Sequence, residues 1–152
     1  MILSKSCIYG IQAAIFVTAR AKGEYVSISR ISEELNISFH FLTKVLQQLT
    51  LAEIMVSYRG PKGGVALARN ASDVTLYQLI SAIDGPEMFT ECMLGLPGCG
   101  DAAPCPAHDH WIGVRQRFAD IAHELTLLTL GDKASELNVR LAQELKKVRL
   151  RK

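Results

Sequence analysis

The stretch LTKVLQQLTLAEIMVSYRGPKGGVALAR, residues 42–69, decides the fold because a helical pattern in it runs directly into a hairpin pattern. The apolar residues of its first part follow the i, i+3, i+4, i+7 spacing of a helix with one buried face. They are Leu42, Val45, Leu46 and Leu49. This spacing predicts a helix within FHFLTKVLQQLTLAEI, residues 39–54, with Ser38 as its N-cap.

The second part of the stretch is typical of a β-hairpin. The segments IMVSY (54–58) and VALA (65–68) favour strands, and RGPKGG between them holds a proline and glycines that break a helix and make a turn. Arg59 and Lys62 lie at the tip of this turn. There the glycines let the loop approach a phosphate backbone or enter a narrow minor groove. An ordinary hairpin turn can carry the same charges.

Two further helices are predicted upstream. Residues 6–23, SCIYGIQAAIFVTARAKG, carry apolar residues at helical spacing and end at a glycine; the spaced residues are Ile8, Ile11, Ile15 and Ala19. Cys7 on this helix is interpreted as a small buried residue. Residues 27–35 form a short helix with Ser27 as N-cap, and Asn36 makes a turn into the next helix. Two short helices and a hairpin predict a winged helix-turn-helix, a mainly α fold with a small β-hairpin.

The polar face of the helix at 39–54 predicts contact with DNA. Opposite its apolar stripe lie hydrogen-bonding side chains, namely Ser38, His40, Thr43, Lys44, Gln47 and Gln48. A helix in the major groove presents such groups to base edges and phosphates. A solvated surface helix shows the same pattern, so both interpretations stand at this level.

Composition and charge limit the class of protein. The chain has 152 residues and 49% hydrophobic content, enough for the core of one domain. Its longest apolar run is interrupted by Gln12 and is shorter than the roughly 18 residues of a membrane span, so we expect a cytoplasmic protein without membrane contact. The net charge is +4 over residues 1–69, −6 over 70–130 and +4 over 131–152. There is no P-loop, dinucleotide fingerprint or nucleophile elbow, so no enzyme is predicted.

The loop ECMLGLPGCGDAAPCPAHDH, residues 91–110, gathers thiols and imidazoles among glycines and prolines. Its candidate metal ligands are Cys92, Cys99, Cys105 and His108. Iron–sulfur clusters bind thiolates, and a histidine can replace one of them. Zinc also accepts three cysteines and a histidine, but this loop lacks the usual C-x₂₋₄-C pair. Redox-active thiols without metal are the third interpretation, and Asp109 or His110 can replace His108 as fourth ligand.

After the loop, apolar residues step by 3, 4, 3, 4 and 3 positions over residues 111–131, which predicts a helix with a coiled-coil seam. The seam consists of Trp111, Val114, Phe118, Ile121, Leu125 and Leu128. We predict that it forms a dimer, because helix-turn-helix proteins read two half-sites about one DNA turn apart. Packing against the protein's own first helix is the alternative. Residues 132–152 are expected to form a helical basic tail.

The motifs together resemble a known family. Residues 42–69, then SDVTLYQLISAIDGPE (72–87) and the cysteine loop, resemble the bacterial winged-helix regulators typified by the iron–sulfur cluster regulator IscR and the nitric-oxide-sensitive repressor NsrR. The similarity covers nearly the whole chain. It implies a homodimeric regulator that reads a palindromic operator in double-stranded DNA, with an iron–sulfur cluster on Cys92, Cys99 and Cys105. The offset of His108 matches the 2Fe–2S branch, and a 4Fe–4S cluster is the alternative.

Two departures from that pattern stand out. Six residues separate Cys92 from Cys99, one more than is usual, and Phe41 replaces a common tyrosine. We expect four regions: a winged helix-turn-helix domain (1–90), a cluster-binding loop (91–110), a dimerisation helix (111–131) and the tail (132–152). The leading functional hypothesis is a regulator that senses cluster status, redox state or nitric oxide. The alternative is a regulator of the same fold without a cluster, which responds to thiol oxidation, a metabolite or a partner protein.

Overall fold

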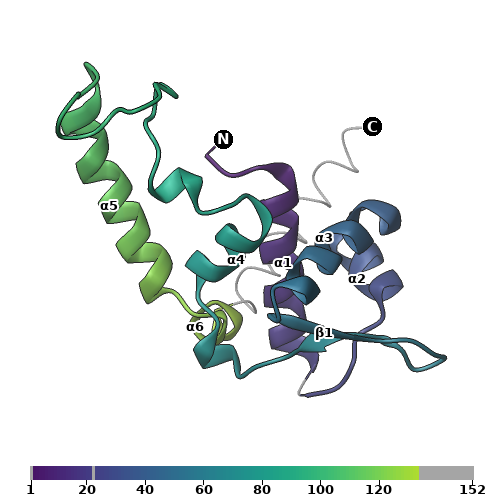
Figure 1. Ribbon diagram of the computed structural model, residues 1–152. Coiled ribbons are helices and arrows are strands. Elements are labelled where there is room, and N and C mark those ends of the chain that lie inside the picture. The colour runs from purple at the N-terminus through teal and green to yellow at the C-terminus, as the bar shows by residue number, and fades with distance from the viewer. Residues whose placement is uncertain (1, 22, 134–152) are drawn as a thin grey trace, which may run out of the picture.

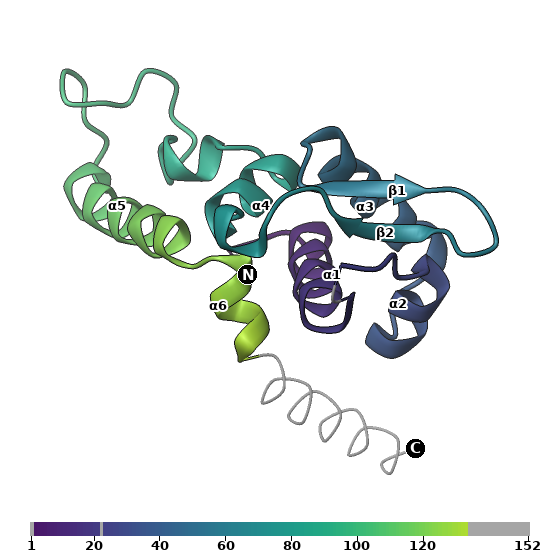
Figure 2. The ribbon, with the colours of Figure 1, turned by 90° about the horizontal axis from the view of Figure 1, so that it is seen from below.

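The computed structural model describes residues 2–21 and 23–133, and Figure 1 shows their arrangement. Most of the basic tail predicted over 132–152 lies outside the described residues. A helical body holds one long helix, α1, at its centre, and a two-stranded hairpin projects from one side (Figures 1 and 2). None of the helices in the described part is long and apolar enough to cross a membrane.

The predicted helix-turn-helix is confirmed. Helix α1 spans Lys5–Ala21, α2 spans Ile28–Leu35 and α3 spans Phe39–Leu51. The hydroxyl of Ser27 accepts the N–H of Arg30 at 3.3 Å, as expected for an N-cap. Asn36 makes the turn with a left-handed backbone. All four residues of the predicted stripe on α3 are buried.

The predicted hairpin is also confirmed. Strand β1 spans Met55–Tyr58 and pairs antiparallel with β2, Gly64–Leu67, in the register Met55 to Leu67 and Tyr58 to Gly64. Val26 adds a short bridge to this wing by exchanging two 2.9 Å backbone hydrogen bonds with Val65. A Cβ on Gly64 would lie 2.1 Å from the carbonyl oxygen of Val26. Glycine is therefore required where the wing meets the segment before α2.

The core forms around α1. Helix α4, Leu76–Ile83, begins with a capping box between Thr75 and Gln78 and packs on α1 and α3. Short 3₁₀ turns at Ala71–Asp73 (η1) and Glu87–Phe89 (η2) flank it. Gly10 allows the approach of α1 to α4, because a Cβ there would lie 2.3 Å from the side chain of Ile83. The predicted burial of Cys7 is confirmed, with no exposed surface.

The prediction of one helix over residues 111–131 is wrong. Helix α5 spans His108–Glu124, and α6 spans Leu127–Asp132. Between them Leu125 is extended, with φ −81° and ψ 115°. Its carbonyl accepts the N–H of Leu76, and Leu127 donates to the carbonyl of Val74, both at 2.8 Å. Pairing with the segment before α4 thus breaks the helix, although the apolar spacing continues through the break.

Because of the break, α5 and α6 pack against different parts of the protein. Helix α6 packs against α1 in the body. Helix α5 contacts α4 and η2 and carries the cysteine loop at its far end, so that loop and wing lie on opposite sides of the protein in both views (Figures 1 and 2).

Candidate functional site

A groove of about 650 Å³ lies between α3 and the wing. Its polar lining includes Ser29 at the start of α2, Thr43, Gln47 and Thr50 on α3, and Ser57 and Arg59 on the wing. The predicted DNA-binding residues Thr43 and Arg59 therefore share one concave surface, whereas Ser38, His40, Lys44 and Lys62 do not line it.

The predicted DNA-binding residues on α3 lie at the surface. His40, Lys44, Gln47 and Gln48 are exposed, and so are Arg59 and Lys62 on the wing. Thr43 is half-buried and donates its hydroxyl to the carbonyl of Phe39 at 2.8 Å, so the hydroxyl oxygen remains as an acceptor. Ser38 occupies the N-cap position of α3, but its side chain makes no capping hydrogen bond, so its predicted capping role is wrong.

The loop between η2 and α5 brings its three thiols together. The Sγ atoms of Cys92, Cys99 and Cys105 all lie within 4.8 Å of one another, and those of Cys92 and Cys105 are 3.5 Å apart. Gly95 and Gly98 have φ of 64° and 73°, a left-handed backbone that glycine adopts without strain. Two turns between Cys92 and Cys99 thus absorb the long spacing noted in the sequence.

His108 joins the thiols from the first position of α5, so the predicted loop ends earlier than residue 110. Its Nδ1 lies 3.3 Å from the Sγ of Cys99, and the residue is only 9% exposed. Asp109 and His110 are exposed. Helix residues two positions apart do not face the same side, so His110 points away from the side that His108 presents to the thiols.

Hydrogen bonds and burial shift the pKa values of the cysteine thiols in different directions. The backbone amides of Leu96 and Leu94 lower the pKa of Cys92 to about 7. The backbone amide of Cys105 lowers the pKa of Cys99, but burial and the neighbouring thiols outweigh it, so this pKa is raised. Outside the loop, burial and the negative charge of Asp84 raise the pKa of Cys7 to about 12. Cys7 is therefore an inert thiol of the core.

Two residues of α5 hold the chain that leads into the cluster of thiols. The indole N–H of Trp111 donates to the carbonyl of Glu91 at 2.9 Å. The guanidinium of Arg115, one turn further on, donates to the carbonyls of Thr90 and Glu91 at 2.6 and 3.2 Å. These hydrogen bonds fix the position of the neighbouring Cys92 relative to His108, which lies on α5 with Trp111 and Arg115. Arg115 was not among the site residues predicted from the sequence. The pattern that could have indicated it is a basic residue four positions after Trp111 in an otherwise acidic region.

Replacing Arg115 by alanine should destabilise this junction. Charged hydrogen bonds contribute about 1.5–3 kcal/mol, less where solvent reaches them. We expect any metal centre held by the loop to be lost several-fold faster to a chelator. Arg117→Ala is the matched control, because Arg117 is exposed and its side chain makes no hydrogen bond within residues 2–21 and 23–133. Equal rates of loss in the two variants would contradict this role.

The predicted dimerisation residues divide between two faces. Phe118 stacks on Phe89 with centroids 5.5 Å apart, and Trp111 serves the loop, so both face their own domain. Val114, Ile121 and Leu128 face outward, with 58%, 36% and 47% of their surface exposed. Leu125 lies at the helix break. An outward apolar stripe remains, narrower than the sequence suggested, and its role in a dimer stays a prediction.

Comparisons with known proteins agree with this architecture. Residues 3–133 match the family model Rrf2, described as an iron-dependent transcriptional regulator. The chain is 30% identical over 131 residues to the HTH-type transcriptional regulator IscR of Pectobacterium atrosepticum, covering 86% of this chain and 79% of that protein. The IscR of Escherichia coli O1:K1 is 29% identical over 131 residues, covering 86% and 80%.

Solved structures show the same fold. CymR of B. subtilis, the global cysteine regulator, superposes with a TM-score of 0.73 at 24% identity, over 86% of this chain and 95% of that one. IscR of T. potens superposes with a TM-score of 0.69 at 23% identity, over 89% of each chain. With the family match over most of its length, the chain belongs to the Rrf2 family of DNA-binding transcriptional regulators and is not an enzyme.

Proposed function

We propose that this regulator acts as a homodimer and binds an iron–sulfur cluster, of the 2Fe–2S type, through Cys92, Cys99, Cys105 and His108. The observation that carries the proposal is the meeting of three thiols within 4.8 Å at the end of α5, with a histidine ring nitrogen 3.3 Å from one of them. Chains in the same family are described as iron-dependent, which supports iron as the metal.

The residues present fit such a group. Three thiolates and one imidazole form an iron–sulfur donor set, and the thiols are partly exposed in a loop whose turns are made by Gly95 and Gly98. Cys92, with its pKa near 7, is readily deprotonated for binding iron. Zinc is less favoured, because six and five residues lie between these cysteines, whereas zinc sites usually contain a C-x₂₋₄-C pair. When bound, an iron–sulfur cluster supplies redox chemistry and sensitivity to oxidants and nitric oxide.

Packed aromatic side chains link the cysteine loop to the reading head, which consists of the helix-turn-helix and the wing in residues 27–69. Phe118 on α5 stacks on Phe89 of η2, whose ring lies 4.5 Å from that of Tyr77 on α4. His123 also stacks on Tyr77, with ring centroids 4.0 Å apart. Helix α4 packs on α3. A shift of α5 when the loop changes state is therefore passed through an aromatic stack to the helix that faces DNA.

A palindromic operator in double-stranded DNA is the proposed partner. Because loop and wing lie on opposite sides of the protein, the loop does not share the groove between α3 and the wing (Figure 1). The proposed DNA-contacting residues are Ser38 at the N-cap position, His40, Thr43 and Lys44 on α3, and Arg59 and Lys62 on the wing. Cluster state then acts through α5 on the separation of two reading heads in the dimer.

Arg59→Ala should weaken operator binding by about 1–3 kcal/mol, because a guanidinium in a groove or on a phosphate contributes that much. Titration of labelled operator at moderate salt measures the change. Arg69→Ala is the matched control. Arg69 is exposed beyond the end of β2, so this substitution removes the same charge outside the groove. Equal affinities of the two variants would remove the wing from the binding surface.

The proposed function is tested on anaerobically purified protein. Analysis of iron and acid-labile sulfide, together with the visible absorption spectrum, is expected to give about two irons and two sulfides per chain and a coloured protein. Operator affinity is then compared before and after cluster removal. Colourless, iron-free protein after reconstitution with iron and sulfide would overturn the cluster.

One observation favours a second candidate. The Sγ atoms of Cys92 and Cys105, at 3.5 Å, are close enough for a disulfide to form without large movement. A cluster-free regulator would then respond to oxidation of these thiols. The same preparations decide between the candidates, because the second predicts iron-free protein whose operator affinity changes with thiol oxidant.

A further inference from the structure

The two ring nitrogens of His108 have different neighbours. Nδ1 lies 3.3 Å from the Sγ of Cys99, and Nε2 lies 3.2 Å from Oδ1 of Asp101. A carboxylate only accepts hydrogen bonds, so Nε2 carries the ring proton and donates it to Asp101. In the neutral ring, the lone pair is then on Nδ1 and points toward the thiols.

We propose that Asp101 is a positioning residue that selects Nδ1 of His108 as the iron ligand and holds the ring toward the three cysteines. The inference rests on the proposed function, because it concerns how the histidine meets the cluster. Histidines that bind metals commonly donate their second N–H to a carboxylate, which fixes the tautomer and the ring orientation and makes the ligand more basic.

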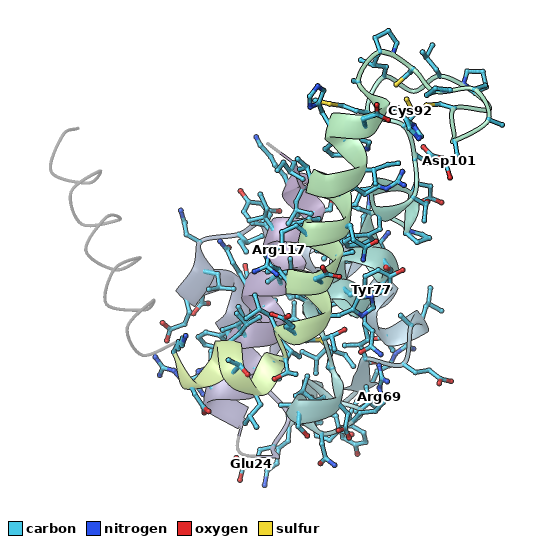
Figure 3. All side chains as sticks on the ribbon, turned by 90° about the vertical axis from the view of Figure 1, so that its left-hand side faces the viewer. Glu24, Arg69, Tyr77, Cys92, Asp101 and Arg117 are labelled. Carbon is cyan, nitrogen blue, oxygen red and sulfur yellow. The ribbon has the colours of Figure 1, made fainter. Side chains whose placement is uncertain are left out.

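The loop is built to bring Asp101 to this place. Gly100 and Ala103 form a backbone bridge, in which Ala103 donates to the carbonyl of Gly100 at 3.0 Å. Asp101 lies at the corner of this tight turn, two residues after Cys99. The turn therefore presents a thiol and a carboxylate to opposite sides of one ring, at the end of α5 where Figure 3 labels Cys92 and Asp101.

The exposure of Asp101 indicates that its contact with His108 positions the ring and adds little to the stability of the fold. The side chain of His108 is 10% exposed, whereas that of Asp101 is 98% exposed. Solvent screens an ion pair at such a surface site, so it contributes little to the stability of the fold. The contact matters instead because it chooses which nitrogen is left unprotonated.

The test uses the full-length chain loaded with its cluster and reduced, with histidine carrying ¹⁵N either at Nδ1 or at Nε2. Hyperfine coupling of the label to the unpaired electron reports which nitrogen binds iron. We expect strong coupling from Nδ1 in the wild type. In Asp101→Ala we expect cluster loss to a chelator to be about 10–100-fold faster, in line with the 10–100-fold loss of metal affinity when an outer partner of a metal-binding histidine is removed, with an unchanged melting temperature.

Two variants separate the hydrogen bond from the charge. Asp101→Asn keeps an acceptor oxygen, so it should restore most of the cluster lifetime and the Nδ1 coupling, while the reduction potential rises because a negative charge is lost. Glu91→Gln is the control for charge alone, since Glu91 precedes Cys92 and its carboxylate makes no hydrogen bond within the described part of the chain.

The results distinguish the role of Asp101 from the presence of the cluster. Coupling from Nε2, or a cluster lifetime in Asp101→Ala equal to that in Glu91→Gln, overturns the role of Asp101 and leaves the cluster in place. Wild-type protein that binds no iron overturns the proposed function, and this inference with it.

Discussion

Cys92→Ala, Cys99→Ala and Cys105→Ala should each give protein that fails to hold a cluster, with visible absorbance lost after anaerobic reconstitution and desalting. The thiols meet within 4.8 Å, so each one is expected to bind iron. Removing one anionic ligand exposes iron to solvent and oxygen. Analysis of iron and sulfide together with the spectrum measures the effect.

His108→Ala should do less damage to the cluster than the cysteine variants. An imidazole is a neutral ligand to one iron, and water can take its place, so a labile cluster with a shifted spectrum is expected. Cys7→Ala is the matched control, because Cys7 is a buried thiol away from the loop and should leave the iron content unchanged. A stable, wild-type cluster in any of the three loop-cysteine variants would remove that residue from the ligand set.

The fold should survive the loop substitutions. Residues 92–107 contain no helix or strand, and their apolar side chains Met93, Leu94 and Leu96 are exposed, so little apolar area is lost. Circular dichroism and operator titration on the same samples check this. We expect a change of site preference or affinity rather than complete loss of DNA binding, because the reading face lies in residues 27–69.

Ile121→Asp should convert the protein to monomers and abolish operator binding. Ile121 lies on the outward stripe of α5 with Val114, and a carboxylate buried in an apolar interface costs several kcal/mol, roughly 3–5 when it is unpaired. At about 1.4 kcal/mol for each factor of ten, the dimer dissociation constant rises by two or more orders of magnitude. Sedimentation velocity over a concentration series measures it.

Controls for the dimer follow from the two faces of α5. Gln116→Asp adds the same charge on a different side of the helix, near Asp120, where like charges cost only a few tenths of a kcal/mol. It should remain dimeric. Phe118→Asp is a poorer test, because Phe118 stacks on Phe89 and the change also damages the domain. An intact dimer in Ile121→Asp and in Val114→Asp would place the interface elsewhere.

The helix-turn-helix and the wing were predictable because their signals are local. The stripe from Leu42 to Leu49 needs only one apolar face, and a helix of that pattern buries it against whatever core is present. Pro61 and the glycines around it allow a turn and little else. The meeting of the thiols was expected from the resemblance, and the loop backbone reaches it through turns at Gly95 and Gly98.

The region after the loop was predicted less well. Spacing alone placed the residues from Trp111 to Leu128 in one seam. In the structure Trp111 holds the loop, Phe118 packs on its own domain and Leu128 lies on a second helix. Apolar residues at helical spacing share one side of a helix. The spacing does not tell whether a given residue packs on its own domain or stays exposed, as Val114 and Leu128 do.

By itself, the sequence determined the reading head, the hairpin and the set of candidate ligands, because these depend on residues close together in the chain. Only the tertiary structure decided that α5 ends at Glu124, that Arg115 holds the entry to the loop, and that Asp101 meets His108. The physical reason is that each of these depends on a hydrogen bond whose partner is chosen by the fold. Leu125, for example, leaves the helix because the amide of Leu76, far away in sequence, is there to pair with it.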